Sequence, residues 1–310
     1  MVLYIVVILI LLAFFSGMLC LRKSILRQPI PTAEETFDSR EKRWGMDMTD
    51  IRQAAAWFRE QRMEEVEILS FDGLRLHGRW LPAEGESRGR ILLFHGYRSG
   101  VLEDLAGALP FYHGLGYDLM IPDQRAHGDS EGKFIGFGVL ERRDCLSWLR
   151  YLENRFGTAP TFLGGVSMGA TTVLMAAGGS LPEDVKGVVA DCGFTSPWEI
   201  VAHEGKRLLH LPPWPLVPLT SLLSRLLAGY GFRDYSTLDA MKTLQVPVLF
   251  IHGGVDNFVP TEMSRRNYEA CRSEKELLIV PEADHGASFL VDGERYRETV
   301  AGFLNRWNPS

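Results

Sequence analysis

The chain has 310 residues, of which 46% are hydrophobic and 23% are charged, and its formal net charge is −6. This composition is too apolar for a disordered chain, and the acidic balance excludes binding of nucleic acid through a basic surface. The 4 cysteines are too few for a disulfide scaffold, and they form no CxxC or Cys/His ligand pattern. We therefore expect no metal and no cofactor.

The first predicted element is an uncharged run from Val2 to Leu21. A helix of that length would be about 30 Å long, which matches the hydrocarbon core of a bilayer. The run lacks the basic start and the small-residue cleavage site of a secretory signal, and Arg22 and Lys23 follow it. Because cationic flanks stay on the cytoplasmic side, the sequence predicts an uncleaved single-pass anchor with the bilayer as a partner and a catalytic domain in the cytosol.

Residues 22–64 are predicted to join this anchor to the rest of the chain. The stretch from Ser24 to Asp47 contains prolines and charges of both signs without apolar periodicity, which is typical of a linker. A helix capped by Thr49 or Asp50 is then expected through Met63, with its apolar residues on one face.

Residues 65–310 are predicted to form one domain in which strands alternate with helices. Val66 to Phe71 and Leu74 to Leu81 surround an Asp-Gly turn, which indicates a hairpin. Buried strands are expected at Arg90 to Phe94, Tyr117 to Ile121, Thr161 to Leu163, Gly187 to Ala190, Val246 to Ile251 and Glu276 to Val280. Helices are expected near Val101 to His113, Val139 to Phe156, Met168 to Ala177, Thr261 to Cys271 and Gly293 to Trp307. This alternation predicts an α/β fold with a mainly parallel sheet of about eight strands, which binds ligands beyond the carboxyl ends of its strands.

A glycine-flanked serine follows the third of those buried strands, in the sequence Gly165-Val166-Ser167-Met168-Gly169. A serine on a sharp turn from a strand to a helix has strained backbone angles and needs small neighbours. Ser167 is therefore a candidate nucleophile. The alternative is a glycine-rich turn that only packs the helix close to the strand.

An aspartate and a histidine follow the last two predicted strands, at Asp256 and His285. A serine hydroxyl needs a base to take its proton, and the base needs a carboxylate to hold its tautomer. The chain order Ser167, Asp256, His285 supplies these groups at one edge of the sheet. Asp191, which follows another strand, is the alternative acid, but Asp256 is preferred because its strand is the one next to that of His285 in the chain.

Donors for a developing oxyanion are expected from the backbone N–H groups of Tyr97 and Met168. Tyr97 follows His95-Gly96 at the end of another predicted strand. His95 and His127, which lies in a polar loop, are expected to be structural.

Four motifs together resemble the α/β-hydrolase fold superfamily, and within it the serine aminopeptidase-like and monoacylglycerol lipase-like branch. They are His95-Gly96, the turn from Gly165 to Gly169, His252-Gly253-Gly254 with Asp256, and Asp284-His285-Gly286. The resemblance covers about Val66 to Trp307. It implies that Ser167 becomes acylated, that an alcohol or amine leaves, and that water then hydrolyses the acyl-enzyme.

The resemblance also implies a cap inserted at about residues 193–242, which here is rich in leucine. Some of its residues are expected to line an apolar acyl pocket or to touch a membrane, although packing within the cap explains most of them. The leading interpretation is a membrane-anchored serine hydrolase of small-molecule carboxylic esters with an apolar acyl group. One alternative is an aminopeptidase or amidase, which needs an acid to hold the substrate amine; Glu199 and Glu204 are the acids near the start of the cap. The other alternative is a non-catalytic scaffold that binds a lipid or a partner.

Overall fold

A single eight-stranded sheet forms the centre of the chain in a computed structural model that describes residues 1–210 and 212–308. The strand order is β1-β2-β4-β3-β5-β6-β7-β8. The strands are β1 Glu64–Leu69, β2 Arg75–Leu81, β3 Arg90–Phe94, β4 Asp118–Pro122, β5 Thr161–Val166, β6 Val185–Asp191, β7 Val248–Gly253 and β8 Lys275–Val280. The β1/β2 and β2/β4 pairs are antiparallel and the remaining pairs are parallel, which confirms the predicted α/β architecture.

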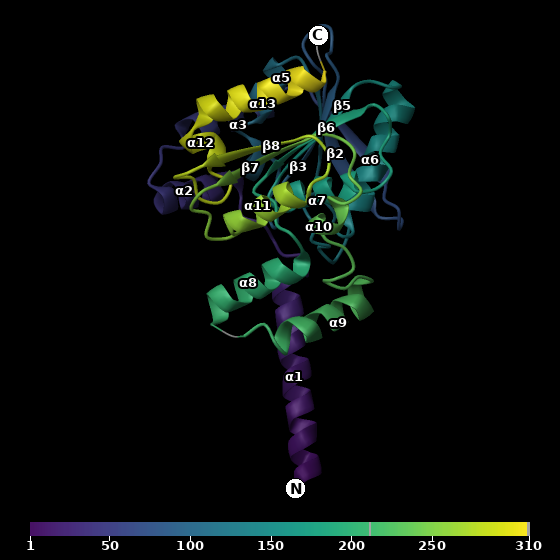
Figure 1. The fold of residues 1–310 in the computed structure, drawn as a ribbon, viewed down its shortest axis with the longest axis vertical. Helices are drawn as coiled ribbons and strands as arrows, with labels where there is room; N and C mark the ends of the chain where they lie inside the picture. Colours follow the sequence, from purple (N-terminus) through teal and green to yellow (C-terminus); the bar gives the residue numbers. More distant parts are fainter. Residues whose placement is uncertain (211, 309–310) are drawn as a thin grey trace.

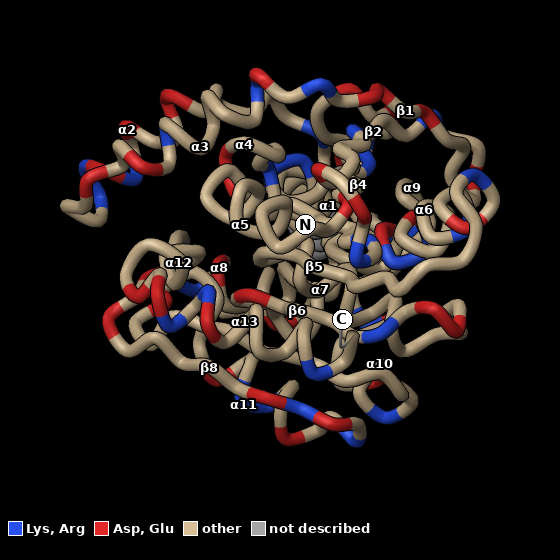
Figure 2. The backbone as a smooth tube through the Cα atoms, turned by 90° about the horizontal axis from the view of Figure 1, so that it is seen from above, with Lys and Arg blue, Asp and Glu red and all other residues tan. Residues whose placement is uncertain are grey.

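Helices cover both faces of the sheet because the central strands are apolar on both sides (Figure 1). On β3, Leu92 and Phe94 belong to one apolar cluster, whereas Ile91 and Leu93 belong to the other. The helices over the first cluster are α6 Glu141–Phe156, α7 Met168–Ala177, α10 Thr237–Ala240 and α11 Thr261–Ala270. Those over the second are α3 Thr49–Glu60, α4 Val101–Leu105, α5 Leu109–Gly114, α12 Ser288–Val291 and α13 Gly293–Trp307. Seen from above, charged residues lie around the outer elements, while β5 and α7 at the centre carry none (Figure 2).

The segment that the sequence predicts to be a linker contains a helix, α2 Ala33–Trp44. A capping box begins it, because the Glu35 N–H donates to Thr32 Oγ1 (3.3 Å) and the Thr32 N–H donates to Glu35 Oε2 (2.9 Å). Phe37 is fully buried against Met48 of the connection to α3 and other apolar residues. The pattern Thr-x-x-Glu was the signal that could have identified this helix.

The cap consists of α8 Pro197–Leu209 and α9 Leu216–Ala228, and it encloses the end of the first helix, α1 Val2–Ser24 (Figure 1). Leu21 is buried in the same apolar cluster as Val217 and Leu223 of α9. The two helices approach closely at Gly17, where an added Cβ would lie 2.7 Å from Cγ of Leu219.

The predicted single-pass membrane anchor at Val2 to Leu21, with a cytosolic domain behind it, is wrong. In the described part of the chain, no helix has both the length and the apolar character needed to span a bilayer. The physical reason for the error is that an uncharged run looks the same in sequence whether lipid or protein covers it. Here the last turns of α1 pack on the cap, where Leu21 is buried, whereas Val7, Leu11 and Phe15 of the earlier turns are exposed.

Candidate active site

Ser167 occupies the sharp turn between β5 and α7 that the sequence predicts. Its φ of 57° lies in the left-handed region, which costs a non-glycine residue about 1–2 kcal/mol. The neighbouring glycines allow the turn, since a Cβ on Gly169 would lie 2.0 Å from the carbonyl oxygen of Phe94, and one on Gly165 would lie 2.3 Å from the Gly169 backbone. The Ser167 N–H donates to the backbone oxygen of Asp191 at 2.7 Å, which holds the strained residue in place.

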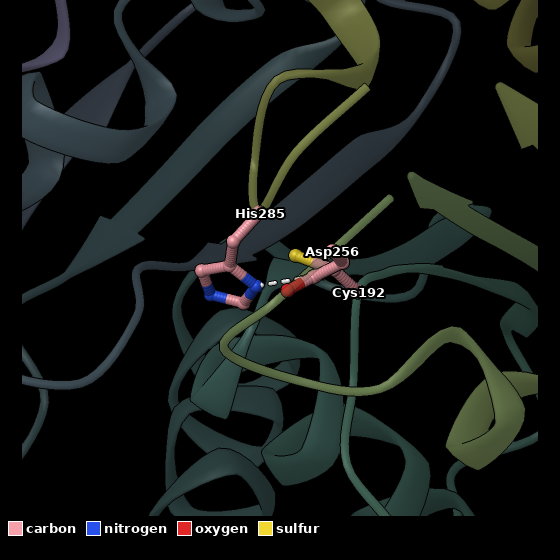
Figure 3. A group of neighbouring side chains, drawn as sticks. All are labelled: Cys192, Asp256 and His285. Atoms are coloured by element: carbon pink, nitrogen blue, oxygen red, sulfur yellow. Dashed lines mark hydrogen bonds and ion pairs between the residues drawn. The ribbon is translucent and has the colours of Figure 1, made fainter. Parts of the chain in front are cut away.

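The structure brings His285 and Asp256 to this serine in a continuous series of hydrogen bonds. The Ser167 hydroxyl donates to Nε2 of His285 at 2.9 Å. Nδ1–H of His285 donates to Oδ2 of Asp256 at 2.7 Å, as Figure 3 shows. His285 projects from the loop after β8 and Asp256 from the loop after β7. This geometry suits a serine nucleophile, a general base and an orienting carboxylate.

A second histidine, His252 at the end of β7, also contacts Asp256; His252 belongs to a motif recognised in the sequence, but the sequence did not predict this contact. Nε2 of His252 lies 3.1 Å from Oδ2 of Asp256 and 2.9 Å from the carbonyl oxygen of Val259, so this nitrogen carries the proton. Nδ1 of His252 accepts from the Ser264 hydroxyl at 2.6 Å. Burial alone would raise the pKa of Asp256, but the hydrogen bonds from His252 and His285 hold that pKa well below its usual range. The carboxylate therefore stays charged.

Asp191, the alternative acid, lies at the end of β6 and has no contact with Nδ1 of His285, which donates to Asp256. Its Oδ1 is buried and lacks a hydrogen-bond partner among residues 1–210 and 212–308. Burial raises the pKa of Asp191 to about 6. The triad acid suggested by the geometry is Asp256.

Replacing Asp191 by asparagine is expected to flatten the pH dependence of folding stability. The pKa of Asp191 is about 6 in the folded chain, against about 3.9 in an unfolded one. The folded state therefore binds more protons between these values, and stability falls by roughly 3 kcal/mol as the pH rises through them. Urea unfolding at pH 4 and pH 7 measures this loss, which Asp191→Asn should not show. The exposed Asp50→Asn is the control, and an unchanged pH slope in Asp191→Asn would contradict the assignment.

The loop after β3 brings the Tyr97 N–H to the same site. An added Cβ on Gly96 would lie 3.2 Å from Cβ of Ser167, so this loop and the serine are adjacent. The N–H of Tyr97 and that of Met168, the first residue of α7, donate to no backbone acceptor within residues 1–210 and 212–308. Both are therefore free for an oxyanion, and their role as its donors stays a prediction.

Helix α2 braces both loops of the site. Oδ2 of Asp104 accepts from the Gly96 N–H at 2.7 Å, and Oδ1 of Asp104 lies 2.6 Å from Nη2 of Arg40. Burial would raise the pKa of Asp104, but Arg40 outweighs it and the pKa is lowered. At the other loop, Arg43 Nη2 lies 2.7 Å from Asp284, the neighbour of His285. Helix α2, which lies in the segment that the sequence predicts to be a linker, thus helps to hold two candidate catalytic loops in position.

His95 and His127 have internal partners, which fits the structural roles that the sequence predicts for them. Nε2 of His95 accepts from the Gln124 N–H at 3.0 Å, and Nε2 of His127 accepts from the Arg98 N–H at 3.0 Å. Burial lowers the pKa of His127 to about 3, so this ring is neutral.

Among residues 1–210 and 212–308, two groups of side chains have the spacing of metal ligands. Cys192, Asp256 and His285 have ligand atoms within 4.8 Å of one another (Figure 3), but Asp256 already accepts from two histidines, and burial raises the pKa of the Cys192 thiol well above its usual range. The other group is His77, Asp123 and Asp129. There the Arg79 guanidinium lies 3.2 Å from Asp123 and 3.6 Å from Asp129, so a cation is already present.

A cavity of about 890 Å³ opens at Ser167 between the sheet, the cap and α1. This volume is near the upper end for small-molecule sites. Its walls are mainly apolar and include Phe137, Phe194, Ile200, Leu208, Leu216 and Leu219. Helix α1 contributes Ala13, Ser16, Leu19 and Cys20, which sequence reasoning had assigned to a lipid environment.

Comparison with known proteins identifies the family. The model of the family described as serine aminopeptidase, S33, matches residues 85–243. YqkD of Bacillus subtilis is 32% identical over 229 residues, which cover 74% of this chain and 75% of YqkD. The alpha/beta hydrolase domain-containing protein WAV2 of Arabidopsis thaliana is 25% identical, over 79% of this chain and 80% of WAV2.

Solved structures share the fold. The Pyrococcus furiosus esterase Pf2001 has a TM-score of 0.68 at 23% identity, covering 92% of this chain and 99% of that one. The Pyrococcus horikoshii acylaminoacyl peptidase has a TM-score of 0.61 at 18% identity, covering 82% of this chain and 43% of that one. The family match, the relative at 32% identity and the shared fold lead to one conclusion: the chain belongs to the serine aminopeptidase S33 family of α/β-hydrolases.

Proposed function

We propose that this chain is a serine hydrolase that cleaves carboxylic esters with an apolar acyl group. The observation that carries the proposal is the hydrogen-bonded series Ser167, His285, Asp256 at the edge of a mainly apolar cavity. Membership of a hydrolase family and the fold of an esterase support the reaction class.

In the first half-reaction, Oγ of Ser167 attacks the ester carbonyl carbon while Nε2 of His285 takes the hydroxyl proton. Asp256 stabilises the imidazolium. The carbonyl oxygen becomes an oxyanion that accepts from the N–H groups of Tyr97 and Met168, each contributing about 3 kcal/mol to the transition state. The bond from carbon to the leaving oxygen then breaks, and His285 gives its proton to the departing alkoxide.

In the second half-reaction, water attacks the acyl-enzyme. His285 takes a proton from the water as its oxygen bonds to the acyl carbon. The bond to Oγ of Ser167 breaks, the carboxylic acid leaves, and the serine regains its proton from His285. Overall, one ester and one water molecule are converted into one carboxylic acid and one alcohol.

Esters are preferred to peptides because the cap acids are already paired. An aminopeptidase needs a carboxylate for the substrate's ammonium group. Glu199 is paired with Arg266, and both oxygens of Glu204 lie 2.7 Å from the Arg207 guanidinium. Neither acid is therefore free to hold an amine.

We expect the full chain to hydrolyse p-nitrophenyl esters with kcat/KM rising from acetyl through butanoyl and hexanoyl to octanoyl. Each methylene that enters the cavity contributes about 0.8 kcal/mol, or up to about fourfold in kcat/KM. The comparison substrates are octanoyl p-nitroanilide, which has the same acyl group, and leucine p-nitroanilide, which has a free amine.

Two results would contradict the proposal. Faster turnover of leucine p-nitroanilide than of any ester would identify an aminopeptidase. Equal kcat/KM for acetyl and octanoyl esters would show that the acyl group does not enter the apolar cavity.

A further inference from the structure

One corner of the cavity differs from the rest because it is polar and cationic. The end of α1 supplies Lys23 and Ser24 to the cavity wall, and the loop after β3 supplies Tyr97 and Arg98. The two segments are joined, since the Tyr97 hydroxyl donates to the backbone oxygen of Ser24 at 2.7 Å. These four residues form what we call the cationic corner.

The charge of Arg98 is uncompensated. Its backbone N–H is held by His127 at 3.0 Å, and its guanidinium lies 5.0 Å from the centre of the Tyr97 ring. Nη2 donates to the carbonyl oxygen of Leu26, at 3.3 Å, and Nη1 donates to no acceptor in the described part of the chain. A half-buried guanidinium with unused donors favours an anionic ligand.

Lys23 adds a second positive charge to the corner. Neither Lys23 nor Arg98 forms an ion pair with a carboxylate among residues 1–210 and 212–308. Glu204, the one acidic residue of the cavity wall in those ranges, is already bound to Arg207 on both oxygens. The described residues therefore leave the corner with a net positive charge.

The position of the cationic corner relative to the ester carbonyl carbon is inferred from the order of residues in the chain. Arg98 comes directly after Tyr97, whose N–H is the proposed oxyanion donor, and Lys23 and Arg98 line the same cavity as Ser167. The walls formed by Leu208, Leu216 and Leu219 of the cap, with Leu19 of α1, are apolar. An ester has an acyl end and an alcohol end, and the apolar walls suit the acyl end. The cationic corner is then the part of the cavity that remains for the alcohol end of the ester.

We infer that the substrate is an amphiphilic ester whose leaving alcohol carries an anionic group, a phosphate or a carboxylate, bound by Lys23 and Arg98. The inference rests on the proposed function and specifies its substrate class. In the reaction the bond between acyl carbon and alcohol oxygen breaks and His285 protonates the alkoxide. The alcohol departs with its phosphate or carboxylate intact.

Three esters with the same octanoyl chain test the inference: 1-octanoylglycerol, 1-octanoylglycerol 3-phosphate and the octanoyl ester of glycolate. At low salt, we expect kcat/KM of the full chain to be about tenfold higher for the anionic esters than for the neutral one. A preference for the phosphate or for the carboxylate identifies which anion is bound. The ratio should fall at 0.5 M NaCl, because the Debye length shortens to less than about 5 Å.

Variants separate anion binding from a general effect on the oxyanion. Lys23→Gln should lower the ratio of anionic to neutral kcat/KM about threefold, as expected for an exposed charge. Arg98→Gln should lower it about tenfold and Arg98→Lys should restore much of it. Lys206→Gln, which removes an exposed lysine of α8 outside the cavity wall, should leave the ratio unchanged.

A wild-type ratio near one with all three esters hydrolysed would overturn the inference while leaving the esterase proposal intact. The inference is also overturned if Lys23→Gln and Arg98→Gln lower kcat/KM equally on all three esters, because the cations would then act on the oxyanion. If none of the esters in either panel is hydrolysed, the proposed function itself fails, and this inference fails with it.

Discussion

Replacing Ser167 by alanine is expected to lower kcat for ester hydrolysis by about 10⁴- to 10⁶-fold, as in other triad enzymes. Without Oγ no acyl-enzyme forms, and the remaining rate comes from the oxyanion donors and substrate binding. The fold should persist, because the strained turn is held by the backbone hydrogen bond from the N–H of residue 167 to Asp191. Steady-state kinetics on the octanoyl ester measure the loss.

The matched control is Ser16→Ala, which removes a hydroxyl from the wall of the same cavity but not from the triad. It should keep kcat within about twofold of wild type, since no proton transfer depends on it. A fluorophosphonate probe should label the wild-type protein and Ser16→Ala at Ser167, and should leave Ser167→Ala unlabelled. Substantial turnover by Ser167→Ala would remove this residue as the nucleophile. Failure of the wild-type protein to react with the probe would favour a non-catalytic scaffold.

Replacing Arg125 by methionine is expected to lower the free energy of unfolding by about 3–5 kcal/mol, because it leaves a buried carboxylate unpaired. Arg125 and Asp144 have side-chain exposures of 3% and 4%, and the guanidinium donates to both Asp144 oxygens, at 2.6 and 2.7 Å. It also donates to Asp72 at 3.0 Å. Burial opposes the charged form of Asp144, and the Arg125 guanidinium offsets that effect on its pKa. Urea unfolding followed by circular dichroism measures the change.

An exposed pair provides the comparison. Arg155 and Glu64 are 42% and 45% exposed and lie 2.6 Å apart, so Arg155→Met should cost less than about 1 kcal/mol. The double variant Arg125→Met with Asp144→Leu should recover most of the loss, because it removes both buried charges. Equal losses in Arg125→Met and Arg155→Met would show that burial does not set the energy of the Arg125 network.

The residues of the candidate triad could be predicted because their positions follow from the sheet. Parallel strands end at one edge, so Ser167, Asp256 and His285 converge whenever their strands are identified correctly. The glycines around Ser167 made its turn recognisable. Both Asp256 and Asp191 follow strands; the order of the strands in the sequence favoured Asp256, and in the structure Nδ1 of His285 donates to Asp256.

Features that depend on contacts between distant segments could not be predicted in this way. His252 lies four residues before Asp256, and their interaction requires the chain to turn back after β7. Helix α2 had a visible capping box, but its role depends on Arg40 and Arg43 reaching loops far along the chain. The environment of α1 depends on its packing against α9, some 200 residues away, and no periodicity within Val2 to Leu21 reports on that.

The packing of α1 on the cap has a practical consequence for anyone who shortens this chain. A version that begins after Ser24 would retain the residues of the sheet, the cap and the candidate triad. It would lack Ala13, Ser16, Leu19 and Lys23 from the cavity wall, and the Tyr97 hydroxyl would lose its acceptor. Rates measured on such a truncation would describe a wider and less selective pocket than that of the full chain, so substrate screening requires the N-terminal helix.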